Sequence, residues 1–427
     1  MTKSIVFLFI LLITLGFFAY TMRRIFRVMM LMKPFHIDQP MKRLKLMFQV
    51  AVLQSKIFRR PAVGLAHALV FWGFLVITLG SIEMVVDGIS GSERVFSSLG
   101  SLYLAIVLSG DIFSLIVLLG ILLFLFRRLF LRIHRFYGDE MKPVSKIDAG
   151  VALVMILMLM VSLIGTNVFY LGLHHEFPVS AMPVSRIFLP WLAGMNVGQI
   201  YFYHEVFWWS HILLIFAFAN YLPYSKHFHV FTSIPNVYLT RLQPLGQMEP
   251  MPEVEVEVRQ MLFPDAAAGS ETPAPGRFGI RDVEDMSWKS YFDSLACTEC
   301  GRCTSVCPAN LTGKKLSPRK IMMDIRARVR EKRSGMLRAG KTYQDGRSLL
   351  NDWISPEELW ACTTCNACAQ ECPVNINQPL VILGMRRYLV MEEAAVPHQL
   401  ASMLSNIENN GAPWQYPAEV REEWMKS

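Results

Sequence analysis

Five apolar stretches, each about as long as a helix that crosses a bilayer, dominate the first 240 residues of this 427-residue chain. A helix rises about 1.5 Å per residue, so about 20 residues cross the ~30 Å hydrocarbon core. The stretches cover roughly residues 4–20, 62–86, 102–126, 149–171 and 206–224. Because backbone polar groups in lipid must be satisfied within the segment, the stretches predict a five-helix transmembrane bundle. The first lacks a small-residue cleavage site and is followed by arginines, so we interpret it as a retained anchor.

Positive charge is distributed unevenly among the segments between these stretches. Ten Lys and Arg residues lie between positions 21 and 61 and six between 127 and 148, against one each in 87–102 and 171–206. Loops rich in Lys and Arg stay in the cytoplasm. The bias predicts a multi-pass protein of the inner membrane of a bacterium, with its N-terminus outside. It also accounts for most of the net charge of +8 without nucleic acid.

All eight cysteines lie in two groups of four, each of which ends before a proline. The groups are Cys297, Cys300, Cys303 and Cys307, and Cys362, Cys365, Cys368 and Cys372. A secreted disulfide framework would scatter its cysteines, so this clustering indicates metal in a reducing compartment. The C-x2-C-x2-C-x3-C-P spacing is typical of two [4Fe-4S] clusters, in which the fourth cysteine ligates the other cluster.

The spacing therefore predicts two crossed ligand sets. The first set is Cys297, Cys300, Cys303 and Cys372, and the second set is Cys362, Cys365, Cys368 and Cys307. Zinc is the competing interpretation, because paired C-x2-C motifs also make tetrahedral sites. Zinc sites rarely use three closely spaced cysteines and a fourth before proline, and here that pattern occurs twice.

The 54 residues between the two cysteine groups exceed what a compact ferredoxin needs, and they carry helix signals. Ser317 and Pro318 form an N-cap and a first-turn proline, and residues 355–358 form a capping box. These signals predict an α-helical ferredoxin domain. We interpret the basic residues after Pro318 as a solvated helix face rather than a docking surface. They are Arg319, Lys320, Arg326, Arg328, Arg330, Lys332 and Arg333.

The predicted fold class is all-α, in two halves. The predicted divisions are a five-helix transmembrane domain (1–237), a linker (238–285), a cytoplasmic two-cluster ferredoxin domain (286–395) and a C-terminal tail (396–427). The linker is rich in Pro, Glu and Ala. Within it, the alternation of Val254, Val256 and Val258 predicts a short edge strand.

Histidines near the ends of two apolar stretches are candidate haem b ligands. Haem b takes two axial ligands, usually imidazoles from different helices, and an unpartnered imidazole in lipid is costly. His67 lies near the cytoplasmic end of the second stretch, and His229 follows the fifth at the same end, so we predict that they bind one haem. His227 is the nearest competitor of His229. A hydrogen-bonded packing role is the alternative for any single histidine.

Three more polar residues lie at membrane depth near the outer side. His211 precedes His229 by 18 residues, about 27 Å along a helix, so it is a candidate ligand of a second haem or a contact of a quinone. Glu83 and Asp111 are candidates for quinone binding or proton transfer, because an ionisable group within a membrane is a functional hypothesis by default. Capping or a helix-to-helix hydrogen bond is the alternative.

These motifs resemble known families over nearly the whole chain. The membrane half, at AHALVFW (residues 66–72) and from His211 to His229, resembles the nitrate reductase gamma subunit and the membrane subunit of heterodisulfide reductase. In the gamma-subunit pattern both histidines of the fifth helix bind haem. The cysteine half, at ACTECGRC (296–303), WACTTC (360–365) and RRYLV (386–390), resembles heterodisulfide-reductase-like iron-sulfur proteins.

The chain departs from these families at two places. The gamma subunit has a second histidine in helix two, and this chain has Ile77 there, which argues against an outer haem. Related fused proteins continue into Cys-Cys-Gly domains, whereas no cysteine follows Cys372. The resemblance therefore implies a separate Cys-Cys-Gly partner subunit, a flavoprotein donor, or both.

The expected function is that of a quinone-linked oxidoreductase subunit of a respiratory membrane. By analogy with the fused relatives, electrons pass from an electron-transferring flavoprotein through the clusters and haem b to menaquinone. The reverse direction is the alternative, in which quinol feeds a disulfide or sulfur-compound reductase. A membrane redox sensor without turnover is an alternative of another class, and it predicts no haem.

Overall fold

The computed structural model describes residues 2–263, 277–415 and 417–426. Its regular structure is helical, and the described residues form no strand, only two isolated bridges that join Lys33 to Ser287 and Leu350 to Ile354. Within these ranges, five helices are long and apolar enough to cross a membrane. The predicted all-α class and the five long helices are confirmed.

The five long helices are α1 (Thr2–Met29), α3 (Pro61–Ser90), α4 (Ser101–Leu129), α5 (Pro143–Leu173) and α6 (Val197–Tyr221). Each of these helices is longer than the apolar stretch that predicts it, and several begin or end at a proline, a capping residue or a glycine. Pro61 and Pro143 occupy the first turns of α3 and α5, and Asn196 caps α6 in a capping box with Gln199. Gly91, in the left-handed conformation with φ 71°, ends α3.

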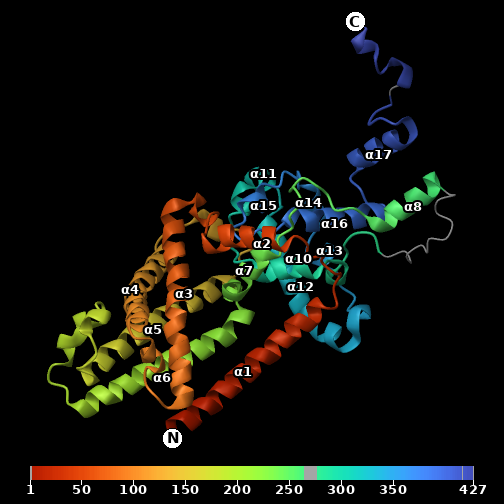
Figure 1. Ribbon diagram of the computed structural model, residues 1–427. Helices are drawn as coiled ribbons and strands as arrows, with labels where there is room; N and C mark the ends of the chain where they lie inside the picture. Colours follow the sequence, from red (N-terminus) through yellow and green to blue (C-terminus); the bar gives the residue numbers. More distant parts are fainter. Residues whose placement is uncertain (1, 264–276, 416, 427) are drawn as a thin grey trace.

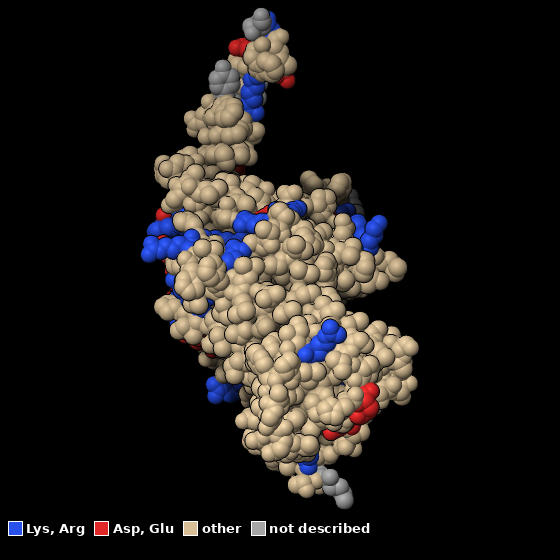
Figure 2. Space-filling model, turned by 90° about the vertical axis from the view of Figure 1, so that its left-hand side faces the viewer, with Lys and Arg blue, Asp and Glu red and all other residues tan. Residues whose placement is uncertain are grey.

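Helices α3 to α6 form a bundle, and α1 runs obliquely from one end of it to the other half of the molecule (Figure 1). The bundle presents few charged side chains on the face that Figure 2 shows, while Lys and Arg side chains gather where the bundle meets the other half. We call this the basic end of the bundle. It carries residues 21–61 and 127–148, as the charge count predicts.

The other half is a set of shorter helices around one core. They are α10 (Trp288–Ala296), α11 (Pro308–Leu311), α12 (Pro318–Ala339), α13 (Leu349–Asp352), α14 (Pro356–Trp360), α15 (Ala367–Glu371) and α16 (Gln378–Met391). The side chains of Ile321, Val329 and Leu359 are fully buried in this core. The predicted N-cap of Ser317 and the capping box of Ser355 and Glu358 are confirmed.

Two short helices, α2 (Pro40–Met47) and α7 (His229–Tyr238), lie between the bundle and this core, and α17 (His398–Asn410) projects from it (Figure 1). The core also includes the end of α1, through Ile25 and Val28. Apolar side chains therefore join the two halves, in addition to the linker.

The predicted solvated face of α12 is wrong, because four of its seven basic residues are buried and only Arg330 is exposed. Arg328 is fully buried, with Nη2 2.6 Å from Asp282 Oδ2 and Nη1 2.6 Å from Asp345 Oδ2. Lys332 is also buried, with Nζ 2.8 Å from both Asp282 Oδ2 and Glu284 Oε2. Burial of a cation requires an anionic partner, and the partners here come from distant segments that the helix pattern does not reveal.

The predicted edge strand is also wrong, because residues 252–262 form helix α8 (Pro252–Leu262). Pro252 begins it, and Glu255 pairs with Arg259 one turn later, with Nη2 3.1 Å from Oε1. Residues 264–276 of the predicted linker lie outside the described residues. The last linker residues pack into the core, where Val283 is fully buried.

We expect Gly88→Leu to lower the melting temperature of the detergent-solubilised protein by about 3–10 °C. Gly88 faces the ring of Phe7, and an added Cβ would stand 2.7 Å from that ring, so α1 could not pack against α3. Thermal unfolding followed by tryptophan fluorescence measures the effect. Gly16→Leu is the matched control, because no heavy atom lies within 4 Å of a Cβ there. Equal shifts in the two variants would contradict this packing.

Candidate metal centres

The first cysteine set encloses one cavity of about 20 Å³. Cys297, Cys300 and Cys303 lie on the loop after α10, and Cys372 follows α15. The loop curls tightly because Glu299 and Gly301 adopt positive φ angles of 57° and 72°. A Cβ on Gly301 would stand 2.8 Å from Arg319 Nη1, so this position needs glycine for space as well.

The second cysteine set is built on the same backbone pattern. Thr364 and Asn366 have positive φ angles of 55° and 60°, at the positions that correspond to Glu299 and Gly301. Cys307 lies within electrostatic reach of Cys362 and Cys365, whereas Cys372 lies within reach of Cys297 and Cys300. The structure therefore brings each fourth cysteine to the other motif.

The two sets differ in exposure. In the first set Cys297, Cys303 and Cys372 are buried and Cys300 is half-buried. In the second set Cys365 is exposed and Cys362 half-buried. Burial raises the pKa of Cys372 and of Cys368 to about 12 each, so their thiols hold their protons until a metal displaces them.

The four thiols of the first set line the same cavity. Four cysteines around a cavity, with no disulfide between them, are the donor set of a [4Fe-4S] cluster.

Segments at the basic end of the bundle hold the loop of the first set in place. Lys56 Nζ donates to Cys372 O at 3.2 Å, and Arg302 donates to the carbonyl oxygens of Lys56 and Ile57 at 2.9 and 3.3 Å. Arg319 pairs with Glu140, with Nη2 2.7 Å from Oε1, and it donates to the carbonyl oxygen of Arg135 at 2.6 Å. The first set is thus anchored before α3 and between α4 and α5.

Glu299 is the centre of a buried ionic network. It pairs with Arg326, whose Nη1 also donates to Cys297 O at 3.0 Å, and it accepts from Ser145 of α5. Its Oε2 stands 3.4 Å from Lys226 Nζ, in the segment that follows α6. One carboxylate therefore joins the loop of the first cysteine set to two segments of the bundle.

His67 and His229 come together at the basic end, from α3 and α7, within electrostatic reach of each other. His229 Nδ1 lies 3.3 Å from Lys226 O, which leaves Nε2 free, as in metal-ligating histidines. Burial lowers the pKa of His229, so the imidazole is neutral. His67 Nδ1 has no hydrogen-bond partner. The ligation of one haem b by these two imidazoles stays a prediction.

The other histidine candidates have different surroundings. His227 Nδ1 lies 3.0 Å from Ser225 Oγ and 3.8 Å from Asp148 Oδ2, which is a hydrogen-bonded, structural setting. His211 is buried, with Nδ1 3.0 Å from Leu159 O, and its Nε2 has no partner. Ile77, which stands at the position of the second helix-two histidine of the gamma subunit, is also buried.

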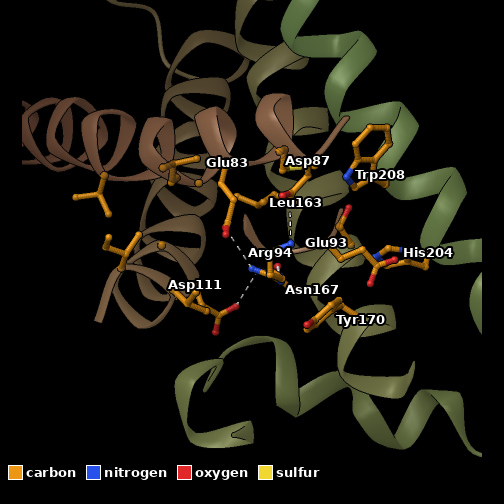
Figure 3. Close-up of a pocket in the computed structure, with 18 residues that line it drawn as sticks. Glu83, Asp87, Glu93, Arg94, Asp111, Leu163, Asn167, Tyr170, His204 and Trp208 are labelled. Carbon is orange, nitrogen blue, oxygen red and sulfur yellow. Dashed lines mark hydrogen bonds and ion pairs between the residues drawn. The ribbon is translucent and has the colours of Figure 1, made fainter. Parts of the chain in front are cut away.

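Glu83 and Asp111 share a cavity of about 90 Å³ at the opposite end of the bundle (Figure 3). The carboxylate of Asp111 binds a loop, because its Oδ2 accepts from the backbone N–H groups of Val184 and Ser185 at 2.7 and 3.2 Å. Glu83 accepts from Phe96 N at 3.1 Å, with Arg94 4.0 Å away. The alternative of loop capping thus describes both carboxylates, because each accepts from a backbone N–H group outside its own helix.

Sequence reasoning did not connect Arg94 and His204 with this cavity. Arg94 stands over the ring of Tyr170, 4.3 Å from its centroid, and donates to Tyr103 Oη at 3.2 Å. His204 is buried, and its Nδ1 has no hydrogen-bond partner. Arg94 carried a signal, because it is the single cation of residues 87–102.

Residues 296–376 match the family model of the 4Fe-4S dicluster domain. The chain is 27% identical to the probable iron-sulfur-binding oxidoreductase FadF of Bacillus subtilis, over 87% of this chain and 53% of that protein. It is 27% identical to EtfAB:quinone oxidoreductase of Syntrophomonas wolfei, over 91% of this chain and 54% of that protein. A probable membrane-anchored ferredoxin of Chromohalobacter salexigens is 31% identical, over 35% of this chain and 24% of that protein.

The chain thus spans about half the length of the first two relatives, and no solved structure matches it. Both of these relatives are named oxidoreductases, and the first is named as iron-sulfur-binding, in agreement with the expected oxidoreductase subunit. The likeness of the membrane half to the nitrate reductase gamma subunit stays a prediction.

The crossed ligand sets can be tested with pairs of cysteine variants. Two clusters contain about eight iron atoms per chain. We expect Cys297→Ala with Cys372→Ala to keep about four, because both residues serve one cluster. We expect Cys368→Ala with Cys372→Ala to lose nearly all iron, because they serve two. Iron analysis and EPR of the purified protein measure this, and the reverse pattern would show uncrossed sets.

Proposed function

We propose that the chain is the membrane subunit of an electron-transfer oxidoreductase that links a cytoplasmic donor to membrane quinone. The observation that carries the proposal is the attachment of the first cysteine set to the segments that bear His67 and His229. Lys226 contacts both sides: its Nζ pairs with Glu299 of the first cysteine loop, and its carbonyl oxygen accepts from His229 Nδ1. The similarity of the chain to EtfAB:quinone oxidoreductase supports the same proposed function.

The residues of the chain hold and position the cofactors. The two crossed cysteine sets would hold two [4Fe-4S] clusters, and His67 and His229 would hold one haem b. These groups, when bound, supply one-electron transfer. The chain contributes burial of the first set, fixed separation between that set and the histidines, and membrane insertion with the N-terminus outside.

Electron entry is proposed at the second cysteine set. Cys365 is exposed there, whereas three cysteines of the first set are buried. A reduced partner can therefore approach the second set more closely. A flavoprotein, or an iron-sulfur subunit with Cys-Cys-Gly domains, is the proposed partner.

The proposed quinone end is the cavity that Figure 3 shows. Glu83 and His204 line it, and both can carry a proton at the place where quinone chemistry consumes or releases one. Asp111 holds the neighbouring loop in place. His211, with Nε2 free, is the candidate for a quinone contact or for a ligand of a second haem.

We expect His67→Ala and His229→Ala each to abolish the b-type absorbance that appears when the purified protein is reduced with dithionite. Each imidazole occupies one axial position, so the loss of either leaves the haem without its bis-histidine ligation. His227→Gln is the matched control and should retain the spectrum. Loss of the spectrum in His227→Gln alone would transfer the ligand role to His227.

Quinone reduction by a reduced electron-transferring flavoprotein tests the function and its direction. We expect the protein with its partner to reduce a menaquinone analogue, and Glu83→Gln to slow this reaction at least ~10-fold, because it removes a proton carrier. Dithionite reduction of the haem should be unchanged in this variant. Turnover only with quinol as donor would favour the reverse direction, and no quinone-linked reaction in either direction would favour a sensor.

A further inference from the structure

Arg135, on the segment between α4 and α5, has a guanidinium group with two unused donors. Its Nε and Nη1 atoms are buried, and neither has a hydrogen-bond partner among the described residues. An arginine stays charged in a protein, and the buried donors of a charged group are costly to leave without an acceptor. The arrangement therefore calls for an acceptor close to this side chain.

The surroundings of Arg135 place it against the loop of the first cysteine set. Its carbonyl oxygen accepts from Arg319 Nη1 at 2.6 Å. A Cβ on Gly301 would stand 3.0 Å from that oxygen and 3.3 Å from Arg135 Cβ. Cys300, the residue before Gly301, lies within electrostatic reach of the guanidinium. The side chain of Arg135 therefore begins in contact with this loop, beside one of its four cysteines.

Two other arginines near this loop have anionic partners of their own. Arg319 pairs with Glu140, with Nη2 2.7 Å from Oε1, and Arg326 pairs with Glu299. Arg135 differs from them, because two of its buried donors remain unused. The two carboxylates of the network are thus held by other cations, which leaves a cysteine sulfur as the acceptor for Arg135.

Cys300 and its counterpart in the second motif differ in exposure. Cys365 occupies the same position of the C-x2-C-x2-C-x3-C pattern, and it is exposed, whereas Cys300 is half-buried. A cysteine that ligates iron is a thiolate, and water can solvate that charge at Cys365. At Cys300 the segment between α4 and α5 packs against the loop, so a charged donor of the protein can take the place of water.

We propose that Arg135 donates hydrogen bonds to the Cys300 thiolate and so raises the reduction potential of the first cluster. The inference rests on the proposed function for the presence of the clusters, and it does not need the haem. Reduction adds one electron to the cluster, and a fixed cation stabilises the added negative charge. Net charge and hydrogen bonds to the sulfurs set the potentials of iron-sulfur clusters. The membrane half would thus set the potential of the first cluster as well as its position.

The test compares Arg135→Gln and Arg135→Lys with Arg132→Gln in the full-length, detergent-purified protein. Arg132 is exposed and lies three residues earlier, so it is the matched control. EPR redox titration measures the potentials of the clusters, and iron analysis counts the clusters. We expect Arg135→Gln to shift the equilibrium of one cluster about tenfold toward the oxidised form, which is ~59 mV for one electron. Arg135→Lys keeps the charge and should shift it less, and Arg132→Gln should not shift it measurably.

A second background identifies the cluster that shifts. Cys362→Ala with Cys365→Ala removes ligands of the second motif only, so the cluster that remains is the one that Cys300 serves. We expect Arg135→Gln to shift this remaining cluster by the same factor. An unchanged titration in this background would overturn the inference.

Each other outcome has a definite meaning. No shift relative to Arg132→Gln, or equal shifts of both clusters, would overturn the inference. If Arg135→Gln loses iron, restoration of the iron and the potential by Arg135→Lys would support it, and loss of iron in both variants would overturn it. If the double cysteine variant holds no iron, the titration of the two-cluster protein decides.

Failure of the proposed function gives a different result. Absence of clusters from the unmodified protein would overturn the proposed function and this inference together. Absence of b-type absorbance, with a cluster that shifts in Arg135→Gln, would overturn the proposed haem and support this inference.

Discussion

The buried carboxylate of Glu299 is the interaction on which the arrangement of the two halves depends. It lies in the loop between Cys297 and Cys300 and meets cations from two directions, Arg326 of the helical domain and Lys226 of the membrane half. Removal of one partner from such a buried group costs about 3–5 kcal/mol, because the remaining charge is left unpaired. The network therefore fixes the loop against the bundle at one separation.

A fixed separation matters for electron transfer more than for folding. The same short segment supplies Lys226 to Glu299 and a carbonyl oxygen to His229. Motion of the helical domain relative to the bundle would therefore have to break this ion pair. The burial of Ile25 and Val28 in the core of the helical domain also holds the two halves together.

Features that depend on local pattern could be predicted from the sequence, and features that depend on distant partners could not. Apolar length predicts the five long helices, and proline and capping signals predict the starts of α12 and α14. The basic side chains of α12 look solvated from their spacing alone. Two of their partners, Asp282 and Glu140, lie 46 and 179 residues away along the chain, and no local signal indicates them.

The same distinction applies to the site. Cysteine spacing predicts which thiols gather, because the curl of the loop is local. The loop that Asp111 binds depends on how residues 184–185 fold back over α4, which the pattern of a single helix does not contain. The place of Arg94 and His204 in this cavity could not be predicted for the same reason.

The burial of the end of α1 has a consequence for biosynthesis. Ile25 and Val28 belong to a core whose other members include Met385 and Leu389, so this part of α1 completes its packing only after residues 29–384 have been made. During the synthesis of the residues between them, these side chains have no native neighbours to cover them. Assembly of this protein should therefore be slow to finish, and lipid or a chaperone must shelter the tip of the first helix in the meantime.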